Sequence, residues 1–264
     1  MDLDTTPALS PPTNLIPDFT DPPTLMVPVT ATCVLVFILP TLFITIRVFS
    51  KSYLAVGHNV EDWLSYLAWA GLVTYTSILF YVEDYGFARH QWDLSMRQFR
   101  HIMYFLSTLN CIYGPTTLAA KLSILFQIKR IFAPGSRDAM YWVTVTSIVA
   151  NIILYTGLSF SYVFQCLPRE RIWNPDVPGR CVSTASLNLV SGIMNVLSDI
   201  EALLLPAWAI WHLRMPIQRK LAAYAVFGIG LVACMIGIVG VGLRVVVLRN
   251  ADFTWLCTQA ALLV

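Results

Sequence analysis

The segment Asn195-Val-Leu-Ser-Asp199-Ile-Glu201-Ala-Leu-Leu-Leu-Pro206-Ala-Trp-Ala-Ile-Trp211 places two acidic residues inside a run that is otherwise apolar. It closes a longer stretch, residues 183–211, that is long enough to cross a membrane as a helix. An ionised side chain in hydrocarbon costs on the order of 2.5 kcal/mol or more. Each of the two acids therefore needs a partner or a functional reason to be there.

The two acids fall on different sides of the predicted helix. At about 100° per residue, Asp199 shares its side with small and polar residues, whereas Glu201 lies on another side, near Trp208. The residues on the Asp199 side are Asn188, Ser191, Gly192, Asn195, Ala202 and Pro206. We expect this polar stripe to face the interior of a helix bundle.

The composition of the whole chain supports a membrane protein. Of its 264 residues, 57% are hydrophobic and 12% are charged, and the mean hydropathy is +0.67. A soluble domain carries about 25% charged residues. We therefore predict an all-α, polytopic bundle of membrane helices whose main partner is the lipid bilayer. The net charge of +2 is spread over short loops and forms no basic patch, so no nucleic-acid partner is predicted.

The apolar runs predict six complete spans and part of a seventh. The complete spans are residues 24–46, 63–82, 101–127, 139–166, 183–211 and 221–248. A further run begins at Phe253 and reaches Val264, which is shorter than the roughly 20 residues that a crossing helix needs. We expect a seven-helix topology with the seventh helix cut short. Residues 1–25 are proline-rich and predict a disordered or extended extracellular tail, followed by a transmembrane domain over residues 26–264.

The distribution of Lys and Arg predicts the orientation. No basic residue precedes the first span, whereas Arg47 and Lys51 follow it, which places the N-terminus outside or in a lumen. The compact basic loops at residues 129–138 and 214–220 agree with this orientation. The loops at residues 83–100 and 167–181 carry three Arg each and count against it, although acids dilute them.

Cys166 and Cys181 bracket the loop between the fourth and fifth spans. If that loop lies outside, an oxidising compartment would permit a disulfide between them. Cys111, near the outer end of the third span, is a competing partner for either, and two free thiols are a further alternative because spacing alone does not fix connectivity. The remaining cysteines, Cys33, Cys234 and Cys257, lie in apolar runs and are expected to pack there.

The third predicted span has its own polar stripe around Lys121. Ser107, Asn110, Gly114 and Thr117 share the side of the helix that carries Lys121. An ionisable residue inside a membrane calls for a named partner, and Asp199 is the candidate. At 1.5 Å per residue the two lie at depths that differ by about 6 Å, which the lysine side chain would have to bridge.

A second arrangement is open for these residues. Lys121 could extend towards the headgroups instead, leaving Asp199 protonated or paired with Asn195, Ser198 or water. Glu201 is expected to face a neighbouring helix or a lateral cavity. The predicted intramembrane polar core is thus Lys121, Asn195, Asp199 and Glu201.

Motifs for catalysis, metals and cofactors are missing from the sequence. The four histidines, His58, His90, His101 and His212, lack metal-binding spacing, and no nucleophile elbow, phosphate-binding glycine loop or Cys-x-x-Cys pair occurs. The seventh run contains no lysine to carry a retinal Schiff base. We therefore predict no catalytic residue, no metal site and no cofactor.

Motifs along the whole chain resemble, in order, those of the fungal rhodopsin-domain family of seven-helix membrane proteins, which includes receptor-like surface sensors and a member of the satratoxin gene cluster. The residues that carry the resemblance are Arg47, Gly57-His-Asn-Val-Glu61-Asp62-Trp63, Lys121-Leu-Ser123-Ile-Leu-Phe126, Arg130-Ile-Phe132, Phe164-Gln-Cys166-Leu-Pro168, Trp173, Gly179-Arg-Cys181, Asn195, Asp199, Leu205-Pro206, Trp211, Phe227-Gly-Ile-Gly230, Arg244 and Asp252-Phe-Thr-Trp255. They extend over about residues 30–260. The resemblance implies a rhodopsin-like, GPCR-like topology with the Cys166–Cys181 loop outside, and it does not imply retinal.

The chain departs from the family pattern at two places. Glu61-Asp62 stands where the family usually has two Asp before Trp63. The charged cytoplasmic tail, where a receptor would couple to signalling, is not among these 264 residues, so no G-protein partner is assigned.

The sequence and the family resemblance together predict two alternative functions from different classes. The first is a receptor-like membrane protein that senses a small-molecule ligand or surface cue in a cavity framed by the third, fifth and sixth spans. The alternative is a membrane-embedded enzyme or accessory protein of a fungal secondary-metabolite pathway. In that case Asp199 or Glu201 would donate a proton in an apolar cavity, where burial disfavours the charged form of a carboxyl group. A transporter is less favoured because no internal repeat is visible. Either function fits the plasma membrane or an internal membrane.

Overall fold

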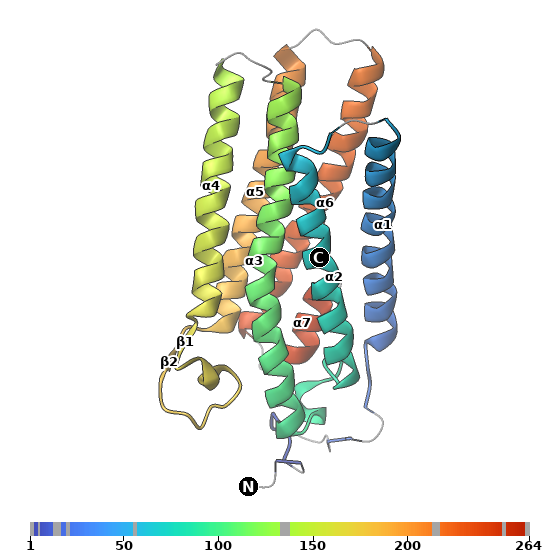
Figure 1. Cartoon of the computed structure of the whole chain (residues 1–264). Helices are drawn as coiled ribbons and strands as arrows, with labels where there is room; N and C mark the ends of the chain where they lie inside the picture. Colours follow the sequence, from blue (N-terminus) through green and yellow to red (C-terminus); the bar gives the residue numbers. More distant parts are fainter. Residues whose placement is uncertain are drawn as a thin grey trace.

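Seven α-helices make up most of the described part of the chain, in a computed structural model that describes residues 3–4, 6–12, 17–19, 22–54, 57–132, 138–212, 217–249 and 252–261. Within these ranges the structure describes the backbone alone for residues 209–212, 217–226, 229, 260 and 261. The helices are α1 (Met26–Tyr53), α2 (Val60–Asp84), α3 (Met96–Phe132), α4 (Ala139–Val163), α5 (Thr184–His212), α6 (Ile217–Arg249) and α7 (Phe253–Ala261). They run side by side, with α3 passing through the bundle between α2 and α4 (Figure 1).

The helices present an apolar surface suited to lipid. Five of them, α1, α2, α4, α5 and α6, are long and apolar enough to cross a membrane by length and composition. Large side chains on their outer faces are strongly exposed, such as Phe43 at 67%, Phe49 at 68% and Ile153 at 68%. Helix α3 is longer, at 37 residues, and more polar, yet it lies alongside the others. The predicted all-α membrane bundle is confirmed, and the protein is a multi-pass membrane protein.

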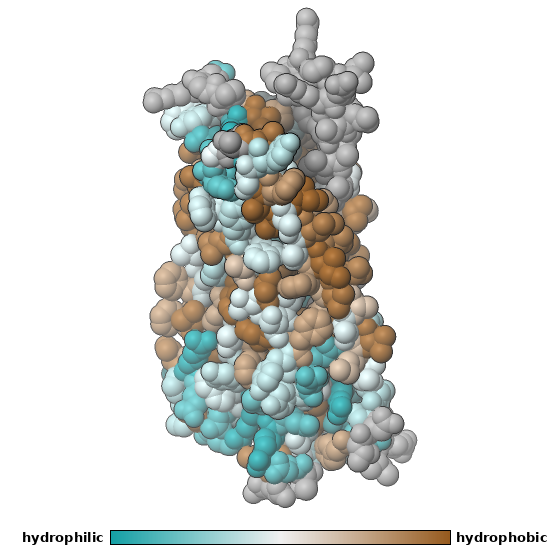
Figure 2. Space-filling view, turned by 45° about the vertical axis from the view of Figure 1, so that its right-hand side comes forward, coloured by the Kyte–Doolittle hydropathy of each residue, from teal (hydrophilic) through white to brown (hydrophobic). Residues whose placement is uncertain are grey.

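One end of the bundle carries most of the described non-helical structure. The tail, the α2–α3 connection with its 3-10 turn η1 (Gln91–Asp93), and the short strands β1 (Cys166–Leu167) and β2 (Arg180–Cys181) with the turn η2 (Arg169–Ile172) between them all lie at this lower end, which we call the hairpin end (Figure 1). Figure 2 shows hydrophilic residues gathered at this end and hydrophobic residues over the middle and upper part of the molecule.

The described part of the predicted tail is extended and bonded to the α2–α3 connection. The backbone N–H of Ala8 donates to the carbonyl of Leu94, and that of Leu25 donates to the carbonyl of Ala88, both at 2.9 Å. The first helix begins directly afterwards, at Met26.

At the opposite end, ion pairs to two buried carboxylates tie the first three helices together. Asp62 at the start of α2 is fully buried and accepts from Arg47 Nε at 2.8 Å and Lys51 Nζ at 3.0 Å, both on α1. Its neighbour Glu61 pairs with Arg130 near the end of α3 at 2.6 Å. The loops predicted at residues 129–138 and 214–220 lie in part outside the described residues, because positions 133–137 and 213–216 are not described. Residues 129–132 belong to α3 and residues 217–220 to α6.

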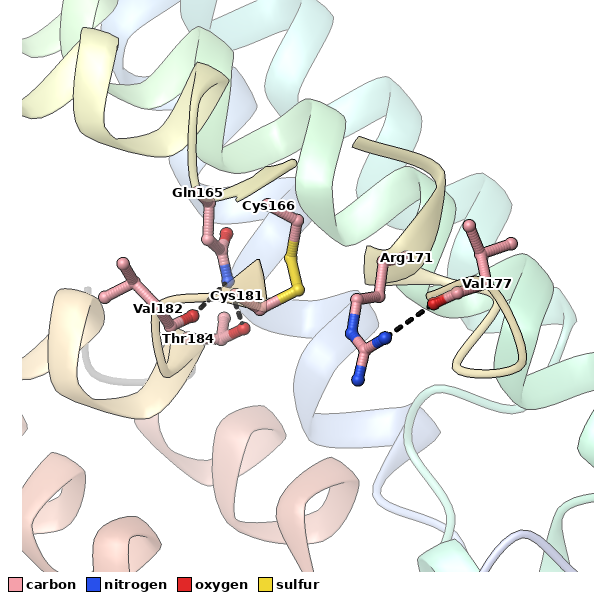
Figure 3. Close-up of a disulfide and its surroundings, with 7 residues drawn as sticks. All are labelled: Gln165, Cys166, Arg171, Val177, Cys181, Val182 and Thr184. Carbon is pink, nitrogen blue, oxygen red and sulfur yellow. Dashed lines mark hydrogen bonds between the residues drawn. A yellow bond between two sulfur atoms is a disulfide. The ribbon is translucent and has the colours of Figure 1, made fainter. Parts of the chain in front are cut away.

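A disulfide closes the small hairpin between α4 and α5. Cys166 and Cys181 are bonded and also face each other in the antiparallel pair of β1 and β2 (Figure 3). Gln165 donates from Nε2 to the Thr184 hydroxyl at 2.5 Å, which fixes the hairpin to the first turn of α5. Cys111, the competing partner, is a free thiol on α3 that lies 3.4 Å from Arg169 Nη2. The predicted Cys166–Cys181 disulfide is therefore confirmed.

Loss of this disulfide should destabilise the folded protein by about 3 kcal/mol, the value expected for a loop of roughly 15 residues. The double variant C166S/C181S would be compared with the wild type by chemical unfolding in lipid nanodiscs. The variant C111S, which removes a free thiol, should change the free energy of unfolding by no more than about 0.5 kcal/mol. Equal stability of C166S/C181S and the wild type would contradict the assignment.

Candidate functional site

The structure brings Lys121 on α3 together with Asp199 on α5. The Lys121 ammonium donates to Asp199 Oδ1, and the lysine side chain is 8% exposed. Asn195, one turn earlier on α5, donates from Nδ2 to Asp199 Oδ2 at 3.2 Å. Of the two arrangements open from the sequence, the structure shows the ion pair rather than a lysine extended towards the headgroups. A charge pair buried in this way neutralises both groups inside the bundle.

A tyrosine from α4 completes this polar core. Tyr155 has no exposed surface, and its hydroxyl donates to Asn195 Oδ1 at 2.9 Å. The same hydroxyl lies 2.9 Å from Ser198 Oγ. The network thus joins α3, α4 and α5 at one depth. Sequence reasoning missed Tyr155, whose only signal was a polar atom inside an apolar span.

Glu201 belongs to a separate contact between α5 and α4. Its carboxylate accepts from Ser147 Oγ at 2.5 Å and from Asn151 Nδ2 at 3.2 Å. Both donors are neutral and lie on the neighbouring helix. The two acids of α5 therefore have different partners.

A cavity of about 210 Å³ lies between the polar core and the hairpin end. It is mainly apolar and aromatic, and the polar groups that reach it include Ser107, Asn110, Asn188 and Ser191. The expected cavity between the third, fifth and sixth spans is therefore present, but α1, α2, α4 and α7 also line it. The full set of described lining residues contains neither Asp199 nor Glu201.

Arg244 of α6 is the cationic residue of the cavity lining. Its side chain lies against α5 at Gly192, where an added Cβ would collide with Nη1 and lie 3.1 Å from Cζ. A glycine at this position leaves room for the guanidinium. The sequence signal for Arg244 was an arginine inside an apolar run, but its proximity to the end of that run gave no reason to place it in a cavity.

The start of α7 closes the bundle at the hairpin end. Asp252 lies 2.6 Å from His90 Nδ1 and accepts the backbone N–H of Gln91 at 3.1 Å. The His90 ring is stacked between Trp92 and Trp255, with centroids 4.4 and 3.9 Å away. This contact fixes α7 against the α2–α3 connection beside the cavity.

The described residues contain no group of three or more His, Cys, Asp or Glu side chains placed to hold a metal ion.

A sequence profile described as the fungal rhodopsin domain matches residues 46–263. The chain belongs to the fungal rhodopsin domain family. The predicted family is therefore confirmed. The matched residues span most of the bundle, from the last turns of α1 to α7.

Relatives of this chain include proteins named for biosynthetic gene clusters. The chain is 31% identical over 165 residues to a SAT4 family membrane protein of Emericella nidulans, covering 62% of this chain and 43% of that protein. It is 26% identical over 251 residues to Fugralins biosynthesis cluster protein 2 of Gibberella zeae, covering 93% and 62%. It is 31% identical over 127 residues to Wortmanamides biosynthesis cluster protein C of Talaromyces wortmannii, covering 48% and 35%.

The chain thus spans between about a third and under two thirds of the length of these curated relatives. No solved structure matches it significantly.

Proposed function

We propose that this protein is a receptor-like membrane protein that binds a small, mainly apolar molecule in the cavity between its helices. The observation that carries the proposal is the cavity itself, with side chains from seven helices converging on it. Small-molecule sites are concave and mostly apolar, with a few placed polar groups, and they often lie between the helices of a bundle. Its volume of about 210 Å³ is below the roughly 300 Å³ at which typical pockets begin, which favours a small ligand.

The proposed orientation places the cavity on the outer or lumenal side. The disulfide lies at the hairpin end, and disulfides persist in oxidising compartments. Arg47, Lys51 and Arg130 gather at the opposite end, as expected for the cytoplasmic side. A ligand from outside the cell or from a lumen would then enter beside the hairpin.

Glycosylation tests this orientation. The substitutions D176N/P178T create an acceptor sequence in the exposed part of the hairpin loop, and S52N/L54T create one at the other end of the bundle. We expect the first variant alone to show a mobility shift that peptide-N-glycosidase F reverses, since only lumenal acceptors are modified. A shift with S52N/L54T and none with D176N/P178T would reverse the proposed topology.

The polar core has a structural role in this proposal. The Lys121–Asp199 pair joins α3 and α5, two of the helices that line the cavity. Through Tyr155 it also connects them to α4. We assign to this network the task of holding the relative positions of the three helices on which the cavity walls depend.

The second candidate function is a role in making a secondary metabolite. The names of the relatives from Gibberella zeae and Talaromyces wortmannii place those two proteins in biosynthetic clusters, which favours this candidate. Its catalytic form has less support, because Asp199 is paired with a cation and Glu201 accepts two hydrogen bonds from α4. An accessory role in such a pathway needs neither acid.

A cavity-filling variant separates the two functions. Ala185 lines the cavity, whereas Ala150 lies on the exposed face of α4, so A185F and A150F are matched changes in and outside the site. Each would replace the gene in its fungal host, beside a deletion strain. The receptor function predicts that A185F and the deletion abolish the transcriptional response to culture extract without accumulation of a precursor, while A150F behaves as wild type. A preserved response together with a precursor accumulating in the A185F and deletion strains would favour the pathway function instead.

A further inference from the structure

The charge inside the cavity is unbalanced. Among the described residues that line it, Arg244 is cationic and none is Asp or Glu. Lys121, the other basic residue deep in the bundle, has its carboxylate partner in Asp199. Arg244 makes no hydrogen bond or ion pair to the described residues. A guanidinium held in a mainly apolar cavity without an anion is unfavourable, and it would be stabilised by a ligand that brings one.

The position of Arg244 is built into the packing of two helices. Its side chain crosses from α6 to the surface of α5 at Gly192, where any larger residue would displace it. An arginine this near the end of a span could otherwise extend towards the headgroups. Because it lies against α5 and lines the cavity instead, its donors are available to a bound molecule.

Further donors surround the guanidinium. Tyr162 donates its hydroxyl to Asn188 Oδ1 at 2.9 Å, which leaves the Asn188 amide nitrogen as a donor on the cavity wall. Arg244 also lies close enough to Tyr75 and Tyr113 to act on their hydroxyls electrostatically. The apolar part of the cavity wall includes Val36, Leu72 and Leu79.

We propose that the ligand of this cavity is a small lipophilic carboxylic acid, with its carboxylate on Arg244 and its hydrocarbon body against the apolar wall. Arg and carboxylate form charge-assisted, often bidentate hydrogen bonds. A single cation in the lining matches a singly charged head group. This inference rests on the proposed function, and it adds the chemical class of the ligand.

The test compares probes with the same eight-carbon chain. Binding of octanoate, 1-octanol and octylamine would be measured by thermal stabilisation of the full chain in phosphatidylcholine nanodiscs. We expect octanoate to bind more tightly than octanol, and octylamine to bind least well. In R244M the affinity for octanoate should fall by about 10- to 100-fold, the worth of a hydrogen bond to a charged group, while the affinity for octanol stays within about twofold.

Two further variants keep the result interpretable. R249M removes a cation from the exposed end of the same helix and should leave octanoate binding unchanged. G192A keeps Arg244 but displaces its guanidinium, so it should weaken octanoate binding and spare octanol. Retained octanol binding shows that each variant is folded.

Three outcomes are decisive. Selective loss of octanoate binding in R244M and G192A supports the carboxylate assignment. Equal affinities for octanoate and octanol, unaffected by R244M, would overturn it and leave the proposed small-molecule site standing. Failure of every probe to bind the wild-type protein would overturn both the carboxylate assignment and the proposed function.

Discussion

Lys121→Met is expected to lower the free energy of unfolding by about 3–5 kcal/mol, because it leaves the Asp199 carboxylate without its cation inside the bundle. Asp199→Asn should also destabilise, since it removes the partner of a lysine that is 8% exposed. The double variant K121M/D199N carries neither charge. The decrease in its free energy of unfolding should therefore be smaller than the sum of the decreases in the two single variants, by about 0.5–3 kcal/mol.

The measurement is chemical unfolding of the four proteins in nanodiscs. Lys129→Met, at the end of the same helix, is the matched control. Its ammonium lies 4.8 Å from the centre of the Tyr141 ring, and loss of that contact costs only about 0.5–1 kcal/mol. Additive losses in K121M, D199N and the double variant would reject the pairing.

Asp62→Ala is the second substitution with a large expected effect. Asp62 is fully buried at the start of α2, accepts from Arg47 and Lys51 of α1, and also accepts the backbone N–H of Asn59 at 2.8 Å. Alanine would leave two cations together without their anion. Breaking a buried pair costs about 3–5 kcal/mol, and because Arg47 and Lys51 are 27% and 19% exposed, we expect a loss near the lower end of that range.

The matched control is Asp84→Ala, which removes an exposed carboxylate from the other end of the same helix. It should change the free energy of unfolding by no more than about 0.5 kcal/mol. Unfolding of D62A, D84A and wild-type protein in nanodiscs gives the comparison. If D62A were as stable as D84A, the ion pairs would not hold α1 to α2.

The features that could be predicted from the sequence are those set by helical periodicity and apolar length. Helical periodicity placed Asp199 and Glu201 on different sides of α5, and the two acids do contact different helices. The helical periodicity of α3 placed Lys121 on a polar face, and Lys121 does contact α5 through Asp199. Helix ends were less predictable. Helix α1 continues past the predicted end at residue 46 to Tyr53, and in these added turns Arg47 and Lys51 form ion pairs with α2.

The features that escaped prediction depend on contacts between distant segments. Glu201 has partners on α4, Ser147 and Asn151, which no pattern within α5 reveals. The place of Arg244 in the cavity depends on a glycine of α5, Gly192, and on lining residues from seven helices. The bonding of the tail to the α2–α3 connection is likewise long-range, and its proline-rich composition alone fits a disordered or an extended segment equally.

The central claim is that a small molecule binds between the helices, and photolabelling tests it most directly. A photoreactive analogue of 1-octanol, with a diazirine at the end of its chain, would be irradiated with the protein in phosphatidylcholine nanodiscs and the adducts mapped by mass spectrometry. If the ligand binds in the cavity, adducts should form on cavity residues such as Leu72, Met103 and Leu106, and excess 1-octanol should abolish these adducts. Adducts confined to lipid-facing residues such as Ile153 and Phe160, unaffected by competitor, would contradict it.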